Sequence, residues 1–404
     1  MKKYYIVIQF CLALIVFSLI GEDVIPTKVD VEYLEVIQVL GFDELENKVR
    51  VTAILKESSQ GDGGAQSGGA VTPGTGKILT VEGETYSQAI DILRNITEKY
   101  IPISHVEYFI IGDETAKKSL RNVVDFISRT DETRVTAGVL VSQEMTAESF
   151  LTKVNEVGTD IVSAVEGVSK DSIAKNYTSN KSVIDVVDMF LQDKIVGVIP
   201  YVAVKDKENF KMVEMAEEPK ETPVFTKNSL GIISDMKVVD SLSFKEAEAY
   251  NITINEVTSI MLTVKLDENT YVLAGNTENF KLRFKTNDNS IQSVVLYLEY
   301  TCDIDEVHSK KPIFDLDTFG EIQTDAENQI EEKVINIITK SKEMNLDFMN
   351  LNKPFEIQHP YVYRKIKSDF FEYLKKADIE VNVECRINNT YDVLESNRYQ
   401  KEGQ

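Results

Sequence analysis

Apolar residues alternate with polar residues most regularly in the last third of the chain. One alternating run covers residues 294–304 and another covers residues 379–387. A period of two predicts β-strands with one buried face. Between these runs, apolar residues recur three and four positions apart, which predicts a long helix at about residues 325–344 and a second helix at residues 361–375. We expect a self-contained α+β module in which helices cover an antiparallel sheet.

Predicted helices and strands alternate along the first half of the chain. Two strands are predicted within residues 29–56, around a polar turn at residues 43–48. Further on, the spacing of apolar positions predicts helices at residues 85–99, 116–128, 150–154 and 182–191, and strands at residues 103–111 and 134–141. This order of elements is typical of an α/β or α+β fold.

The middle of the chain carries shorter predicted elements. A stretch dense in Lys and Glu, residues 205–222, is followed by Pro223 and marks a candidate domain boundary. Beyond it we predict a hairpin around Ser234 and Asp235, a short helix at residues 244–252, and strand-like runs at residues 259–265, 271–274 and 279–286.

These patterns together predict a multidomain α+β protein with mixed or antiparallel sheets, each flanked by helices. The expected units follow one another along the chain. They are a signal peptide or N-terminal membrane anchor at residues 1–21, an N-terminal domain at 22–204 with a Gly-rich loop at 61–76, a middle domain at 205–290, and a C-terminal α+β domain at 291–395.

The first residues have the pattern of an export signal. Lys2 and Lys3 precede an apolar run at residues 4–20, and the chain then turns acidic at Glu22 and Asp23. A basic flank, an apolar stretch and an acidic exit favour a secretory signal or an anchor with the rest of the chain outside the membrane. Since the run is near the short end of the roughly 17–25 residues that span a bilayer, both cleavage and retention stay open.

The composition excludes several classes of function. The chain has 404 residues, with 44 Lys and Arg against 66 Asp and Glu, which gives a formal charge of −22. A nucleic-acid partner is excluded because phosphate backbones require a basic surface. Three cysteines and three histidines are too few for a disulfide scaffold or a zinc cage. The sequence also lacks the Gly-x-Ser-x-Gly and His-Glu-x-x-His motifs, so we expect no enzyme activity, no cofactor and no bound metal.

The Gly-rich loop does not form a nucleotide site. Gly76 and Lys77 resemble the end of a phosphate-binding loop, but Ile78 stands where that loop needs Ser or Thr. We therefore expect residues 61–76 to form a flexible surface loop.

Several short blocks resemble the Ger(x)C family, the C subunits of nutrient germinant receptors in spore-forming bacteria. The blocks in the N-terminal half are Gly83-Glu84-Thr85, the segment from His105 to Gly112, and Asp125-Phe126 with Arg129, Glu132 and Arg134. The blocks in the last third are the long helix, Asn352-Lys353-Pro354-Phe355, His359-Pro360 and the final alternating strand. The order and spacing of the N-terminal blocks also match those of the family.

The resemblance implies a role in spore germination. It implies a non-enzymatic, membrane-associated receptor subunit at the outer face of the spore inner membrane, acting with integral membrane subunits of A and B type. One feature departs from the family: Leu19-Ile20-Gly21 runs into Glu22-Asp23, so the cysteine that would carry a lipid is missing, and Cys11 lies inside the apolar run. The alternative is an exported module that binds cell wall or a small solute on its own.

Four residues are candidates for contact with a partner subunit. They are His105, Arg129, Glu132 and Arg134, all of which lie in the blocks that carry the resemblance. The competing interpretation is that Arg129, Glu132 and Arg134 form surface salt bridges, which contribute little individually, and that His105 is structural.

The remaining histidines and cysteines have structural interpretations that we favour. His308 follows Asp303, Asp305 and Glu306, which are oxygen ligands of the kind a divalent cation prefers, but we favour a loose acidic turn. We expect His359, before Pro360, to fix the entry of a helix. Cys302 and Cys385 lie on the apolar faces of two predicted strands, and we favour free buried thiols over a disulfide between them.

Overall fold

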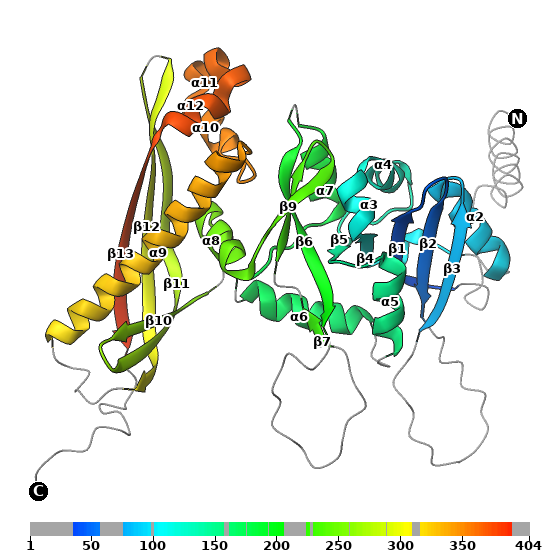
Figure 1. Cartoon of the computed structure of the whole chain (residues 1–404), viewed down its shortest axis with the longest axis horizontal. Coiled ribbons are helices and arrows are strands. Elements are labelled where there is room, and N and C mark those ends of the chain that lie inside the picture. Colours follow the sequence, from blue (N-terminus) through cyan, green and yellow to red (C-terminus); the bar gives the residue numbers. More distant parts are fainter. Residues whose placement is uncertain are drawn as a thin grey trace, which may run out of the picture.

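The computed structural model describes residues 35–56, 76–97, 101–156, 161–174, 176–192, 194–205, 224–226, 229–257, 259–287, 289–308 and 316–389. The expected signal or anchor, most of the Gly-rich loop and most of the charged connection after residue 205 lie outside these residues. The described part of the chain builds a sheet of nine strands and a sheet of four. The two sheets follow each other along the long axis of the molecule (Figure 1).

The first sheet has a parallel centre between antiparallel edges. Its strand order is β3-β2-β1-β4-β5-β6-β8-β9, and β7 pairs with β6. The pairs β1–β4, β4–β5 and β5–β6 are parallel, whereas the other pairs are antiparallel. The strands are β1 Ile37–Glu44, β2 Val49–Leu55, β3 Lys77–Gly83, β4 Tyr108–Gly112, β5 Gly138–Ser142, β6 Val196–Lys205, β7 Val224–Thr226, β8 Leu230–Ser234 and β9 Lys237–Leu242.

Helices cover both faces of the first sheet, which explains the continuous apolar runs in its inner strands. In β4, Ile110 packs into the core on one face, while Phe109 and Ile111 pack into the core on the other. The first of these cores is covered by α5 Ala147–Glu156 and α6 Ile161–Ala174. The opposite core is covered by α2 Tyr86–Thr97, α3 Asp113–Lys118, α4 Arg121–Arg129 and α7 Val183–Phe190.

The second sheet is mixed. Its strands, in spatial order, are β10 Ile260–Leu266, β11 Asn269–Asn287, β12 Ser290–His308 and β13 Asp378–Asn389. The first three form an antiparallel meander, and β13 lies parallel to β12. A parallel pair needs a long crossover connection. Here the helices α9 Leu316–Met344, α10 Asn352–Gln358, α11 Pro360–Ile366 and α12 Phe370–Lys376 supply it.

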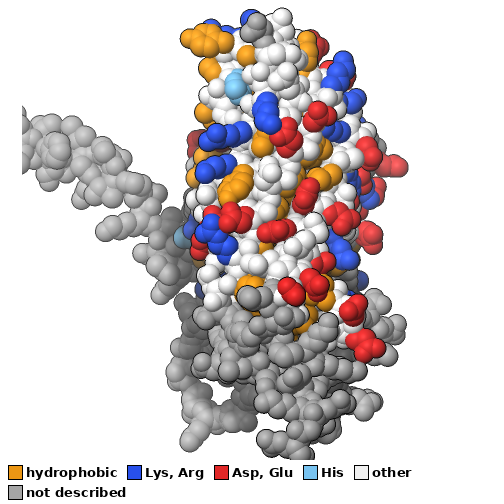
Figure 2. Space-filling model, turned by 90° about the vertical axis from the view of Figure 1, so that its left-hand side faces the viewer, with side chains coloured by type: hydrophobic (Ala, Val, Ile, Leu, Met, Phe, Trp, Pro, Cys, Tyr) orange, Lys and Arg blue, Asp and Glu red, His pale blue; other side chains and the backbone are white. Residues whose placement is uncertain are grey.

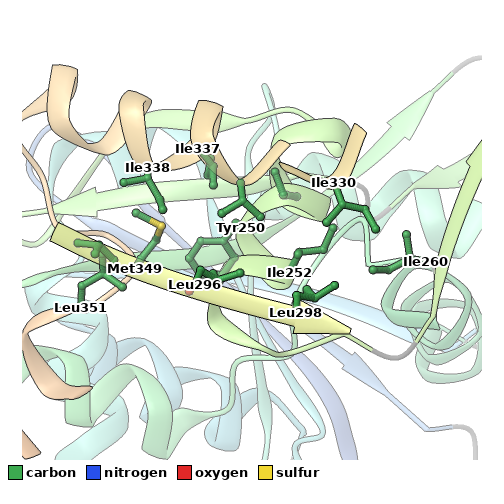
Figure 3. Close-up of a cluster of buried hydrophobic side chains, with 14 of the residues drawn as sticks. Tyr250, Ile252, Ile260, Leu296, Leu298, Ile330, Ile337, Ile338, Met349 and Leu351 are labelled. Carbon is green, nitrogen blue, oxygen red and sulfur yellow. The ribbon is translucent and has the colours of Figure 1, made fainter. Parts of the chain in front are cut away.

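Helix α9 packs on one face of the second sheet through the predicted apolar stripe. The buried residues of this stripe are Ile322, Ala326, Ile330, Val334, Ile337 and Ile338. Figure 3 shows Ile330, Ile337 and Ile338 in one cluster with Leu296 and Leu298 of β12. The helix begins nine residues earlier than predicted, at Leu316.

The residues of the expected middle domain are divided between the two sheets. β8 and β9 extend the first sheet, whereas β10 and β11 begin the second. Between them lies α8, Phe244–Ile254, which starts with a capping box formed by Ser243 and Glu246. A single hydrophobic cluster runs from Leu230 of β8 through Tyr250 of α8 into the second sheet. The two units therefore share a core, while the domain boundary itself stays a prediction.

Two predicted strands of the N-terminal half are wrong in extent. The strand predicted at residues 103–111 begins only at Tyr108, because the 3₁₀ helix Ile103–His105 follows Pro102. His105 therefore lies in a 3₁₀ helix and does not open a strand. The strand predicted at residues 134–141 begins at Gly138, since the residues from Arg134 onward form a turn.

Two elements of the C-terminal half also differ from the prediction. The runs at residues 271–274 and 279–286 belong to the single strand β11, which a register shift between Thr277 and Asn279 interrupts without ending. The helix predicted at residues 361–375 is divided into α11 and α12 by a 3₁₀ turn, Lys367–Asp369, because Ser and Asp favour turns over helix interiors. The predicted hairpin is confirmed, with Asp235 and Met236 both in the left-handed region.

Candidate partner-contact surface

Arg129 is the last residue of α4 and is exposed to solvent. Its Nε donates a hydrogen bond to Oδ1 of Asp125, one helical turn earlier, at 2.7 Å. The pair borders a hollow of about 400 Å³ that is also lined by Tyr86, at the start of α2. Arg129 is thus held by its own helix and stays available for a contact from outside.

Glu132 has an internal role. Its carboxylate accepts hydrogen bonds from Nη2 of Arg94 at 3.2 Å and from the backbone N–H of Ile103 at 3.3 Å. These bonds join the turn after α4 to the end of α2 and to the 3₁₀ helix that carries His105. Glu132 therefore positions the segment around it.

His105 and Arg134 are both exposed. Arg134 donates from Nε to Oγ1 of Thr136 at 2.9 Å, which fixes the turn before β5. Among the four candidates, Arg129, His105 and Arg134 present side chains to solvent, whereas Glu132 is partly buried between elements.

An apolar surface adjoins Arg134 and was not among the predicted site residues. Val135 is 54% exposed, and its carbonyl accepts a hydrogen bond from the N–H of Ile184, which is 50% exposed. Leu191, just after the end of α7, is 78% exposed and lies seven residues after Ile184, on the same side of the helix. We call Val135, Ile184 and Leu191 the α7 patch. The seven-residue spacing was visible in the sequence, but the proximity of Val135 was not.

Two buried carboxylates lie where the parallel strands end, the edge at which α/β sheets commonly bind ligands. Asp43, in β1, accepts hydrogen bonds from the N–H groups of Ala147 at 2.8 Å and Glu148 at 3.0 Å, and so caps α5. Burial raises the pKa of Asp43, and the two backbone hydrogen bonds oppose that change.

Asp113, directly after β4, holds the neighbouring loops in the same way. It accepts hydrogen bonds from Nζ of Lys117 at 2.8 Å, from the N–H of Glu144 at 3.1 Å and from the hydroxyl of Tyr201 at 3.3 Å. The hollow beside it has a volume of about 290 Å³. Both carboxylates are engaged by the protein itself, and this edge of the sheet is stabilised by them.

Comparison with known families identifies the chain. The model of the spore germination protein N-terminal domain matches residues 27–204, and the model of the spore germination B3/GerAC-like C-terminal domain matches residues 228–391. The chain belongs to the Ger(x)C family of spore germination proteins. The resemblance drawn from the short sequence blocks is thereby confirmed.

The Ger(x)C fold is also found among solved structures. The crystal structure of the GerBC protein matches with a TM-score of 0.52 and 15% identity, covering 87% of this chain and 97% of that chain. At this identity the match supports the α+β, multidomain fold. No curated protein matches the chain significantly in sequence.

The histidines of the C-terminal unit of this Ger(x)C chain serve local structure. His308 contacts Glu306 on the exposed end of β12. His359 lies at the junction of α10 and α11, and its Nε2 donates to the carbonyl oxygen of Phe284 at 3.0 Å. In the described residues, no group of three His, Cys, Asp or Glu side chains is arranged to hold a metal ion.

The two cysteines of the Ger(x)C C-terminal unit are free and buried. Cys302 of β12 and Cys385 of β13 approach each other with their Sγ atoms 3.9 Å apart. The contact with Cys302, together with burial, raises the pKa of the Cys385 thiol.

Of the helices that the structure describes, none combines the length and apolar character needed to cross a bilayer.

Proposed function

We propose that the chain is the C subunit of a nutrient germinant receptor, a non-enzymatic protein that acts with integral membrane subunits of A and B type. The observation that carries this proposal is the match of two germination-family models to both units of the molecule. We further propose that it works at the outer face of the spore inner membrane, because residues 1–21 have the pattern of an export signal or anchor.

The exposed side chains around the α7 patch support a role in assembly. Apolar side chains flanked by charged residues are typical of protein–protein contacts. Val135 and Ile184 supply the apolar part, and Arg129 and Arg134 supply charge close by in sequence. We propose that this surface, with His105, contacts a membrane subunit. Glu132 contributes to this surface by positioning the turn between Arg129 and Arg134.

Anchoring follows from the same proposal. Because Glu22 and Asp23 stand where a lipid-bearing cysteine would be, we propose that the apolar run at residues 4–20 stays uncleaved and holds the chain at the membrane. Mass spectrometry of the N-terminus of the mature protein tests this directly.

The receptor role is tested by deletion and by native co-purification. Spores lacking the gene, in a strain without a second copy, should fail to respond to the nutrient, and an unchanged response would overturn the proposal. With a tag after Gln404, the chain should bring down multispanning partners from solubilised spore membranes. Ile184→Asp should lose those partners. Met261→Asp is the matched control, since Met261 is 60% exposed on β10 in the other unit. Purified chain that binds cell wall or solute with no membrane partner would favour the stand-alone module.

A further inference from the structure

The helical end of the C-terminal unit exposes two large apolar side chains. Ile357 of α10 is 81% exposed, and Tyr361 of α11 is 77% exposed. They lie four residues apart across the junction of the two helices. We call the segment from α10 to α12, residues 352–376, the tip. Figure 1 shows the tip at one end of the second sheet, beside the turn between β11 and β12.

The helices that carry these exposed side chains are well packed against the rest of the unit. Phe355 is fully buried, with ring centroids 5.1 Å from Phe284 of β11 and 5.3 Å from Phe370 of α12. Packing on this scale fixes α10 and α11 against the sheet. Ile357 and Tyr361 therefore project from a rigid surface.

The tip is basic in an acidic protein. Residues 352–376 contain six Lys and Arg against three Asp and Glu, which gives +3, whereas the whole chain carries −22. All six cations are exposed: Lys353, Arg364, Lys365, Lys367, Lys375 and Lys376. The three carboxylates, Glu356, Asp369 and Glu372, are exposed as well. Figure 2 shows the side of the molecule formed by this unit, with hydrophobic side chains protruding at its upper end and acidic side chains prominent lower down.

One cation lies directly over the exposed aromatic ring. The guanidinium carbon of Arg364 is 5.2 Å from the centroid of the Tyr361 ring. An amphipathic ring beside a cation suits the boundary between lipid headgroups and acyl chains, where the ring contacts apolar groups and the cation contacts phosphates.

We propose that the tip docks onto the surface of an anionic phospholipid bilayer. Ile357 and Tyr361 enter the headgroup region, and Arg364 with the neighbouring lysines contacts the lipid phosphates. The proposal rests on the proposed function, because it names the surface with which the subunit meets its membrane.

Charge complementarity decides for lipid as the occupant. An anionic surface repels most of a chain with a net charge of −22 but attracts a region of +3. The α7 patch shows the contrast: Leu191 is as exposed as Tyr361, yet Asp185 and Asp188 of α7 lie close to it in sequence. Because Arg129 and Arg134 also lie near Val135 in sequence, the charges around the α7 patch are mixed, and the patch lacks the net positive charge of the tip.

The absence of tryptophan in the chain allows a direct test. In the full-length protein, Tyr361→Trp places the single tryptophan at the tip, and Leu191→Trp places it on the α7 patch at equal exposure. Each protein is mixed with vesicles of phosphatidylcholine and phosphatidylglycerol, and its tryptophan emission is recorded. Vesicles with brominated acyl chains then report by quenching whether the ring has entered the bilayer.

We expect the Tyr361→Trp protein to show a blue shift and quenching with anionic vesicles, and the Leu191→Trp protein to show neither. Adding Lys353→Glu and Lys367→Glu to the Tyr361→Trp protein should raise the anionic lipid concentration for half of the shift by at least about tenfold, since each basic residue contributes to membrane attraction. Neither lysine takes part in the contact between Arg364 and the ring at position 361.

Three results would overturn the proposal. In the first, the tryptophan at position 361 keeps its water-exposed emission while the protein co-sediments with vesicles. In the second, the emission of the tryptophan at position 191 shifts to the blue and that of the tryptophan at position 361 does not. In the third, the emission at position 361 shifts only with membranes that contain the other receptor subunits, which makes the tip a protein contact. If the vesicle test fails but deletion of the gene abolishes the nutrient response, only the proposal of the docking surface is overturned. If the tip binds vesicles but spores without the gene germinate normally, the proposed receptor role is overturned.

Discussion

The loop before α10 buries a carboxylate that should make the stability of the C-terminal unit depend on pH. Asp347 accepts hydrogen bonds from the N–H groups of Leu351 at 2.9 Å and Asn352 at 3.1 Å, and so ties the loop to the first residue of α10. The residue keeps some exposed surface, but its carboxyl group is enclosed by the loop. Desolvation raises the pKa of Asp347 from 3.8 to about 6, although the two backbone hydrogen bonds act in the opposite direction.

The sign and size of the effect follow from linkage. Because the pKa is higher in the folded state than in the unfolded state, the folded protein binds the proton more tightly. The free energy of unfolding therefore falls as pH rises from 3.8 to about 6 and is lowest, for this group, above that range. A shift of this size corresponds to an upper bound of about 3 kcal/mol at pH 7.

Asp347→Asn removes the titration and keeps an oxygen that can accept the hydrogen bonds from Leu351 and Asn352. The difference in the free energy of unfolding, variant minus wild type, should rise by about 2–3 kcal/mol between pH 3.5 and pH 7. Urea unfolding followed by far-ultraviolet circular dichroism at a series of pH values measures it. Asp369→Asn, at an exposed carboxylate of the tip, is the matched control and should show no comparable change. A flat difference for Asp347→Asn, or one that falls with rising pH, would refute the reasoning.

Three further substitutions or reactions test the packing. A methyl group at Gly112 would stand 2.0 Å from Oδ1 of Asp43, so Gly112→Ala should destabilise the protein by about 1–3 kcal/mol in thermal unfolding. On α6, a methyl group at Gly167 meets no atom within 4 Å beyond the backbone of its own helix, so Gly167→Ala should leave stability unchanged or raise it by up to about 1 kcal/mol. Equal effects of the two changes would contradict the steric argument. Iodoacetamide should modify Cys302 and Cys385 only after denaturation, and mass spectrometry showing either thiol alkylated in the native protein would argue against their burial.

Local periodicity predicted the helices and strands that can be recognised from the pattern of their own residues. The apolar stripe of α9 and the alternation in β12 required only the residues within each element. The start of α9 was missed although Leu316, Phe319 and Ile322 lie three residues apart, because Gly320, a weak helix former, stands among them. The parallel pairing of β13 with β12 is set by a crossover of about seventy residues, and no local pattern records it.

The candidate site shows the same division. Arg129 and Glu132 look alike in the sequence, as charged residues in one turn, yet Glu132 is engaged by Arg94, which lies 38 residues earlier. Such a contact depends on how α2 and α4 meet. Tyr361 carried a signal in the sequence that was not used: it stands outside the apolar stripe formed by Val362, Ile366 and Phe370 in the predicted helix. The α7 patch needed the hydrogen bond between Ile184 and Val135, which only the fold supplies.

The position of β13 has a consequence for biosynthesis. Ribosomes build the chain from its N-terminus, so β12 emerges with one edge unpaired and waits for residues 378–389, the last that the structure describes. Until they arrive, the backbone groups along that edge of β12 can pair with another nascent chain. A premature stop codon after α9 would leave this state permanent. Such a product should aggregate or be degraded, so even a late nonsense mutation is expected to behave as a null allele.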